Sequence, residues 1–374
     1  MNRVIIEKAN LEHNIKLIKD KVRDFRNDKG ESVKIIAVIK GNAYGMDSLL
    51  LARRLIDNNI NFFAVSELDE AIYLRNNKFN NPILLLQSTS NEDVLNQIVE
   101  NNLVATISSL EEIEILNRIA KEQNKNVEAH LKIDTGFGRF GFFIDENNVL
   151  ELANALNKCQ NLKITGTYSH FIESYANDDK LTRQQFNKFI DVIAILKKNK
   201  IETGILHICN SSALFKYPEM YLNAVRVGSA FTGRLQISNL TGLKKVGYFE
   251  TTVCEIKELK KDTTIGYSAT YKLKKDTKVA ITTAGYAEGI GVTGPKDSVR
   301  LIDKLRKIKL ALTTLKQDGR TFVEINGKKY PIIGRIGMKN FMIDVSDSDV
   351  KVGDKVKVDV NLIFVDSKIK RQEI

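Results

Sequence analysis

Cysteine is scarce in this chain, with three residues among 374. Cys159, Cys209 and Cys254 are widely spaced and form no Cys-x-x-Cys pair, the spacing that thiolate zinc sites and redox pairs require. Three separated cysteines also argue against a disulfide framework of the kind found in small secreted proteins. We therefore expect reduced, buried thiols and no metal site.

Tryptophan is absent, and no run of basic residues is interleaved with aromatic residues. The net charge of +11 arises from 57 lysines and arginines that are spread along the chain among 46 acidic residues. A nucleic-acid surface would concentrate its positive charge on one patch, so we expect no nucleic-acid partner. The excess charge favours solubility and attracts anionic cofactors.

Long apolar runs are also missing. No window of about 18 apolar residues is available to span a membrane. The first residues, Met1–Glu7, have too short an apolar run for a secretory signal and are better explained as a strand. We expect a cytoplasmic protein with no membrane partner.

Short apolar runs alternate with longer amphipathic segments over residues 10–238. Between the apolar runs, apolar residues recur at helical spacing, as in Asp47–Asn58, Ser66–Asn76, Leu110–Glu122, Leu150–Lys158 and Thr182–Lys198. Strands that alternate with helices in this way predict an α/β fold, a (β/α)8 barrel of the TIM type. The eight predicted strands are Val33–Ile39, Phe62–Val65, Ile83–Leu86, Val104–Ile107, Ala129–Ile133, Ile164–Thr167, Ile205–Ile208 and Ala224–Val227.

Residues 239–374 have a different pattern, in which short β-branched runs are separated by turns. Asp318-Gly319 and Asn326-Gly327 supply the positive-φ residues of two-residue hairpins. We predict a C-terminal all-β domain that also takes in the N-terminal strand within residues 1–9. Its predicted strands are Phe249–Lys257, Lys278–Thr283, Thr321–Ile325, Lys328–Ile333, Phe341–Val345 and Lys355–Val358.

Lys40 is the first candidate for chemistry. It follows the buried run Ile35–Ile39 and precedes Gly41-Asn42-Ala43-Tyr44-Gly45. The carboxyl ends of barrel strands carry the catalytic groups of such enzymes. An amine that is partly shielded from water there can act as a nucleophile. The alternative is a surface lysine at the end of a strand.

Further polar residues follow other predicted strands. Arg139 belongs to a glycine-rich segment that begins at Asp134, and His170 follows the sixth strand. Cys209-Asn210-Ser211-Ser212 and Arg226-Val227-Gly228-Ser229 follow the last two strands, where barrel loops commonly bind phosphate. As alternatives, His170 could be a histidine of the core, and Ser211 and Ser212 could cap a helix. We interpret His13, His130 and His207 as structural.

Taken together, these segments resemble the alanine racemase family of fold-type III pyridoxal-phosphate (PLP) enzymes, over a match that extends to about Val358. The resemblance is carried in family order by Asn42-Ala43-Tyr44-Gly45, Asp134-Thr135-Gly136 with Arg139, Asn210-Ser211, Arg226 with Gly228, Gly266–Tyr271, Gly285–Gly289 and Gly334–Met338. It implies a homodimer with shared active sites that interconverts L- and D-alanine by two bases, and a role in supplying D-alanine for peptidoglycan.

The resemblance also implies roles for individual residues. Lys40 would hold the cofactor and act as the first base, and Tyr267 would be the second base. Arg226 would face the pyridine nitrogen and leave it unprotonated, because arginine does not give up its proton. The cofactor would further contact Tyr44, His170, Asn210, Ser211, Gly228 and Ser229; the substrate carboxylate would contact Arg139 and Met338; and Lys132 matches a lysine that can be carbamylated.

The chain departs from the family pattern in three places. Met46-Asp47 replaces His-Gly, Lys339 replaces an acidic residue near the substrate entrance, and nothing matches the tyrosine of the family's C-terminal segment. Without that tyrosine the pocket would be wider and would admit larger amino acids. The cation of Lys339 would favour substrates with acidic side chains. The alternatives are therefore a racemase of serine or another larger amino acid, a fold-type III decarboxylase, and a PLP-binding protein without turnover. Arg226 argues against the decarboxylase, which normally pairs the ring nitrogen with an acid.

Overall fold

The computed structural model describes residues 2–235, 237, 241–293, 305, 308 and 321–374. The chain divides into two compact units, one made of Met1–Glu7 and Gly247–Ile374 and the other of Lys8–Val246. No helix among the described residues is long and apolar enough to cross a membrane.

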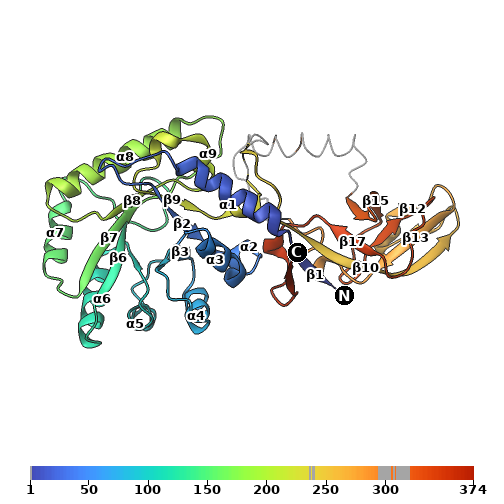
Figure 1. The fold of residues 1–374 in the computed structure, drawn as a ribbon, viewed down its shortest axis with the longest axis horizontal. Coiled ribbons are helices and arrows are strands. Elements are labelled where there is room, and N and C mark those ends of the chain that lie inside the picture. Colours follow the sequence, from blue (N-terminus) through green and yellow to red (C-terminus); the bar gives the residue numbers. More distant parts are fainter. Residues whose placement is uncertain (1, 236, 238–240, 294–304, 306–307, 309–320) are drawn as a thin grey trace. The chain divides into compact units, whose positions relative to one another are not determined.

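The unit Lys8–Val246 is a barrel of eight parallel strands in the order β4-β3-β2-β9-β8-β7-β6-β5, and its helices lie on the outside (Figure 1). A parallel bridge between Leu84 and Val104 joins β4 to the residue before β5 and closes the ring. The predicted (β/α)8 barrel is confirmed. Its strands are β2 (Lys34–Val38), β3 (Phe62–Val65), β4 (Ile83–Leu85), β5 (Ala105–Ile107), β6 (Val127–Lys132), β7 (Leu162–Tyr168), β8 (Ile205–His207) and β9 (Ala224–Val227).

Each barrel helix packs its own apolar face against the strands. Helix α6, for example, begins after Ser109, whose hydroxyl accepts a hydrogen bond from the Glu112 N–H as an N-cap. The predicted helical segments are found with shifts of at most two residues at their ends. The barrel helices are α1 (Lys8–Val22), α3 (Ser48–Asp57), α4 (Leu68–Asn76), α5 (Glu92–Glu100), α6 (Leu110–Glu122), α7 (Val149–Asn157), α8 (Lys180–Lys198) and the short α9 (Ser211–Lys216).

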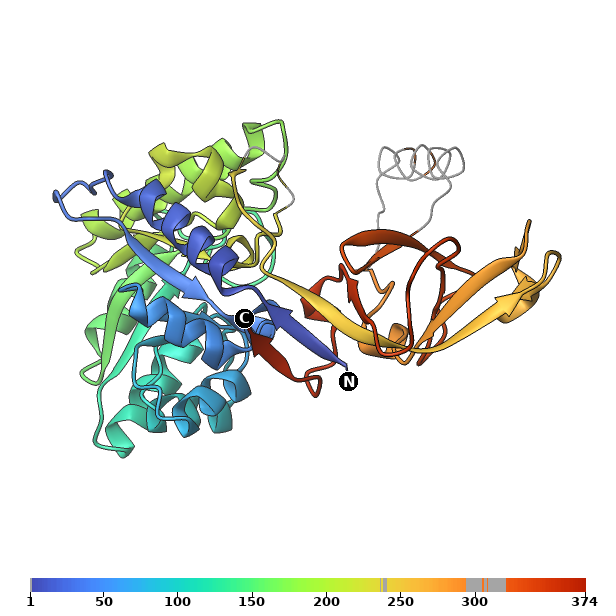
Figure 2. The ribbon, with the colours of Figure 1, turned by 45° about the vertical axis from the view of Figure 1, so that its right-hand side comes forward.

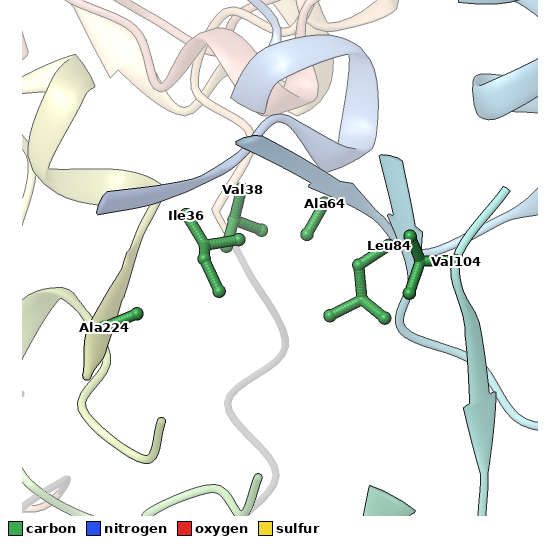
Figure 3. Close-up of a cluster of buried hydrophobic side chains, with 6 residues drawn as sticks. All are labelled: Ile36, Val38, Ala64, Leu84, Val104 and Ala224. Carbon is green, nitrogen blue, oxygen red and sulfur yellow. The ribbon is translucent and has the colours of Figure 1, made fainter. Parts of the chain in front are cut away.

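The barrel interior is apolar on one side and polar on the other. The apolar side is a cluster from β2, β3, β4, β9 and the start of β5: Ile36, Val38, Ala64, Leu84, Val104 and Ala224 (Figure 3). On the other side, His130 of β6 contacts His207 of β8, although β7 lies between these strands, so both rings face the interior. Burying polar groups is costly unless they are hydrogen-bonded, which indicates that this side is built around a network.

The second unit is an all-β domain, as predicted. Its main sheet has the order β13-β16-β15-β14-β17-β10-β1-β18, and β10 pairs with β13 and β17. The strand at the N-terminus, blue in Figure 2, also pairs with β10. The N-terminal strand therefore belongs to this domain. The strands are β1 (Arg3–Ile6), β10 (Gly247–Leu259), β13 (Thr277–Thr282), β14 (Phe322–Ile325), β15 (Lys328–Ile333), β16 (Met342–Asp344), β17 (Lys355–Val358) and β18 (Arg371–Glu373), with a separate ribbon of β11 (Thr264–Ile265) and β12 (Tyr271–Lys272).

Two smaller expectations had different outcomes. Asn326 and Gly327, with φ of 50° and 78°, form the predicted two-residue turn between β14 and β15; Asp318-Gly319 lies outside the described residues. The prediction of buried thiols holds for Cys209, whereas Cys159 is half-buried and Cys254 is exposed because its position on β10 points to solvent.

Candidate active site

A cavity of about 470 Å³ lies at the carboxyl ends of the barrel strands. Among the described residues that line it, none is acidic. Such a lining suits a ligand with several negative charges. The cavity brings together every predicted site residue of the barrel: Lys40, Tyr44, Lys132, Arg139, His170, Asn210, Ser211, Arg226, Gly228 and Ser229.

An unusual turn follows Lys40. Gly41, Asn42, Ala43 and Tyr44 all have positive φ, between 50° and 61°, so α2 (Lys40–Tyr44) is a left-handed turn. For residues other than glycine this conformation costs roughly 1–2 kcal/mol each. Hydrogen bonds from the Ala43 N–H to Ile39 O (2.7 Å) and from the Gly45 N–H to Gly41 O (2.9 Å) support it. Because of this turn, Lys40 and Tyr44 both line the cavity.

The surroundings of the Lys40 amine lower its pKa. Burial is the largest cause that lowers its pKa, and the charges of Arg139 and Arg226 lower it further, while Glu70 opposes them. A lysine with a lowered pKa carries more of the unprotonated amine at neutral pH, which is the nucleophilic and basic form. Lys40 is thus a partly buried lysine at the cavity wall, not an exposed one at the end of a strand, and its surroundings favour the form that a reactive amine requires.

Arg226 is buried beneath the cavity among neutral acceptors. Its guanidinium donates hydrogen bonds to Nδ1 of His207 (2.8 Å), to Nδ1 of His170 (3.0 Å) and to the carbonyl of Ser169 (2.7 Å). Burial lowers its pKa to about 10, so the side chain remains a cation at neutral pH. The hydrogen bonds fix the plane of the guanidinium.

The imidazole tautomers follow from these contacts. Arginine only donates, so Nδ1 of His170 and of His207 must be unprotonated. Nε2–H of His207 then donates to Nδ1 of His130 across 2.9 Å. Burial lowers the pKa of His130 to about 3 and holds those of His170 and His207 well below 6.5. His130 and His207, interpreted from sequence as structural only, therefore belong to the network that orients Arg226.

This chain of donors predicts an NMR result. The protein has four histidines, so 15N-histidine labelling gives four imidazole patterns. We expect those of His130, His170 and His207 to be neutral Nε2–H tautomers that do not titrate between about pH 5 and 8. Replacing His130 by Gln assigns its signal. An imidazolium, or a proton on Nδ1, in any of the three would contradict the network.

Tyr168 holds this network together and was missed by sequence analysis. Its ring stacks on His207 at 4.9 Å, lies 5.0 Å from the Arg226 guanidinium carbon and 4.3 Å from the Lys132 amine, and its hydroxyl contacts Thr106 (2.9 Å). Burial lowers the pKa of Lys132 well below its usual value. Tyr168 is the last residue of β7 and precedes His170 by two residues, and this alternation along an extended segment was the available signal.

Hydroxyl groups gather at the end of the cavity near β9. The Ser211 hydroxyl accepts hydrogen bonds from the N–H groups of Gly228 (3.0 Å) and Ala230 (3.4 Å), so its own hydrogen is left for a ligand. A Cβ at position 228 would overlap the Tyr44 hydroxyl, so only glycine fits there. Burial raises the pKa of Tyr44 to about 12, which keeps that hydroxyl a donor.

Asn210 caps the start of α9, a role that the sequence had suggested for Ser211 and Ser212. Its Oδ1 accepts hydrogen bonds from the N–H groups of Ser212 (3.1 Å) and Ala213 (3.0 Å) and from the Ser174 hydroxyl (2.7 Å). Asn210 is therefore the N-cap of α9. The cap leaves the hydroxyl of Ser211 free to face the cavity.

The glycine-rich segment after β6 is closed by one carboxylate. Asp134 accepts hydrogen bonds from the N–H groups of Gly136, Phe137 and Gly138 at 2.7–2.8 Å. The loop places the Arg139 guanidinium carbon 4.3 Å from the centre of the Phe137 ring and at the cavity wall. Arg139 is thus available to an anionic part of a ligand.

The remaining predicted residues lie in the β domain. Tyr267 begins a 3₁₀ turn after Gly266 and is 70% exposed. Met338 is also exposed, and its carbonyl accepts a hydrogen bond from the Ala287 N–H (3.1 Å). Lys339 forms an ion pair with the buried Glu288. The positive charge at this position is therefore paired with a carboxylate of the same domain.

Comparison with known proteins agrees with this architecture. Residues 6–236 match the family described as alanine racemase, N-terminal domain, and residues 246–361 match alanine racemase, C-terminal domain. The alanine racemase of Methanococcus maripaludis is 31% identical over 353 residues, which are 93% of this chain and 87% of that protein. That of Clostridium tetani is 34% identical over 328 residues, 86% of this chain and 79% of that protein.

A solved structure has the same fold. The alanine racemase of Clostridium difficile 630 aligns with a TM-score of 0.84 at 25% identity, covering 100% of this chain and 95% of that one. The two matched families cover residues 6–236 and 246–361, which lie mainly in the barrel unit and in the β domain, respectively. The chain belongs to the alanine racemase family.

Proposed function

We propose that this chain is a PLP-dependent racemase that interconverts L- and D-alanine by proton exchange between two bases. The observation that carries the proposal is the amine of Lys40, which has a lowered pKa and shares one cavity with Arg226 and a cluster of hydroxyls. None of the described residues that line this cavity is acidic. The names of the relatives, alanine racemases over most of this chain, support the choice of substrate.

The residues of the cavity fit PLP. Tyr44, Ser211, Gly228 and Ser229, with Asn210 beside them, would bind its phosphate through hydroxyl and backbone donors. Lys40 would attach it covalently. When bound, the cofactor supplies an electron-withdrawing ring that makes the substrate's α-hydrogen acidic.

Arg226 and His170 would contact the ring of the cofactor. Arg226 keeps its proton at neutral pH, so in this assignment it would donate to the pyridine nitrogen and would not supply it with a proton. Arg226 would thereby favour proton exchange over decarboxylation and transamination, which need a stronger electron sink. This protonation argument favours the racemase over the decarboxylase.

Two bases would act on opposite faces of the α-carbon. The Lys40 amine would move the proton on one face and the Tyr267 hydroxyl on the other. Arg139 and the backbone of Met338 would hold the substrate carboxylate, and Lys132, whose buried amine has a strongly lowered pKa, would be carbamylated and orient Arg139. A neutral amine is the form that reacts with carbon dioxide.

The homodimer belongs to the same proposal. Tyr267 is 70% exposed in its own domain, which leaves its hydroxyl accessible to a second copy of the chain. Each active site would combine Lys40 of one subunit with the partner's Tyr267. A role in supplying D-alanine for peptidoglycan and a cytoplasmic location stay predictions.

We propose alanine as the substrate on the names of the relatives, and the ion pair of Lys339 with Glu288 weakens the argument for acidic substrates. The test is incubation of the purified protein with both enantiomers of all common amino acids in D₂O. We expect α-deuterium and inversion with alanine, and a visible absorbance band from bound PLP. A protein that takes up no PLP, or that exchanges serine faster than alanine, would contradict the proposal.

A further inference from the structure

The carboxylate of Glu70 contacts the backbone directly after Lys40. Its Oε1 accepts hydrogen bonds from the N–H groups of Gly41 (2.5 Å) and Asn42 (3.3 Å). Its Oε2 accepts from the N–H groups of Ser66 (3.1 Å) and Glu67 (3.3 Å). One half-buried side chain on α4 therefore joins the loop after β2 to the loop after β3.

The segment that Glu70 contacts needs an external support. Gly41 and Asn42 are the first two residues with left-handed backbone in this turn. Within the described part of the chain, the acceptor for both of their N–H groups is the Glu70 carboxylate. Hydrogen bonds to a charged acceptor are stronger than neutral ones. Glu70 thus stabilises the conformation that brings Lys40 to the cavity wall.

Glu112 provides an internal comparison two units further along the barrel. Its Oε2 accepts from the N–H groups of Ser108 (2.5 Å) and Ser109 (3.2 Å), and its Oε1 accepts from the Ser88 hydroxyl (2.6 Å) in the loop after β4. Glu112 therefore uses the same arrangement as Glu70, with one oxygen for its own helix start and one for an earlier loop. Neither loop that it joins carries Lys40.

We propose that Glu70 is a positioning residue that holds the left-handed turn after Lys40 and so fixes where the Lys40 amine lies. The proposal rests on the assignment of Lys40 as the cofactor lysine. Glu70 is also the negative group that acts on this amine against Arg139 and Arg226, and it raises the pKa that burial and the two arginines lower. A purely structural clamp, such as Glu112, has no such effect.

The test compares four variants: Glu70→Gln, Glu70→Ala, Glu112→Gln and Glu112→Ala. Gln keeps an oxygen for Gly41 and Asn42 but removes the charge, whereas Ala removes both. In the cofactor-free protein, Lys40 is labelled with an amine-modifying reagent at a series of pH values and quantified by peptide mass spectrometry. Cofactor retention and the separate values of kcat and KM are then measured on the loaded enzyme.

For both Glu70 variants we expect the midpoint of Lys40 labelling to move to lower pH, because the group that raises its pKa is gone. Glu70→Ala should also weaken cofactor retention by about tenfold or more, the effect of losing hydrogen bonds to a charged acceptor, and lower kcat more than it changes KM. Glu70→Gln should recover part of the retention.

The Glu112 variants should lose stability while keeping the labelling midpoint and cofactor retention of the unmodified protein. Equal labelling profiles for the Glu70 and Glu112 variants would overturn the proposal. Lys40 labelling is read without cofactor, so this result is independent of the proposed function; that function would fail separately if Lys40→Ala protein still bound PLP covalently.

Discussion

Replacing Lys40 by Ala is expected to lower alanine racemisation by about 10⁴-fold or more, the upper range of what one general base contributes. The loss is this large because the same amine attaches the cofactor and moves one proton. The lowered pKa and the position at the cavity wall are the physical basis. Steady-state kinetics in both directions, together with the visible absorbance of the loaded protein, measure the effect.

Lys34 is the matched control, since it begins the same strand at its opposite end and is exposed. Lys34→Ala should retain the absorbance band and nearly full turnover. Substantial racemisation by the Lys40→Ala protein would show that another group is the base on that face.

Replacing Tyr267 by Phe is expected to lower racemisation by about 10²- to 10⁴-fold, because a general acid or base is lost while the cofactor site is untouched. With one base left, a proton can be removed from and returned to one face of the α-carbon, but none can be delivered to the opposite face. In D₂O, one enantiomer of alanine should still exchange its α-hydrogen for deuterium with retention of configuration. Mass spectrometry coupled to chiral separation detects this product.

Tyr271, at the start of β12 in the same segment, provides the control for this variant. Tyr271→Phe should racemise alanine at close to the unmodified rate. If Tyr267→Phe exchanged the α-hydrogen of both enantiomers equally, or of neither, two bases on opposite faces would be the wrong mechanism.

The strands of the barrel were predictable from sequence because each is a short run of buried, mostly β-branched residues. Arg226 lies within β9, whereas the end of β2 placed Lys40 at the carboxyl edge and the same argument placed His170 and Ser211 beyond the ends of β7 and β8. These residues depend only on their position relative to a strand end. A pattern local to the sequence is sufficient for that placement.

Other parts of the site depend on contacts that no local pattern records. Asn42, Ala43 and Tyr44 are not glycines, so nothing in the sequence indicates a left-handed turn, and its support comes from Glu70 in another unit of the barrel. His207 is one polar residue in a short strand, and its role follows only from its contact with Arg226.

The ion pair that Lys339 forms with Glu288 was not predictable from the sequence either. Its partner Glu288 lies 51 residues earlier and meets it only when two loops of the β domain come together. The sequence showed an unusual charge, whereas the structure shows a local ion pair. Charge inversion at one position therefore predicts little about substrate preference until the neighbouring residues are known.

The central claim is that Lys40 of one subunit and Tyr267 of the other form one active site. Mixing inactive Lys40→Ala and Tyr267→Phe proteins in equal amounts, with unfolding and refolding to exchange subunits, tests it directly. Half of the dimers should be mixed, and each mixed dimer should contain one intact site, so about a quarter of the unmodified activity should return. No recovery of activity, with mixed dimers verified by differential tags, would contradict a shared two-base site.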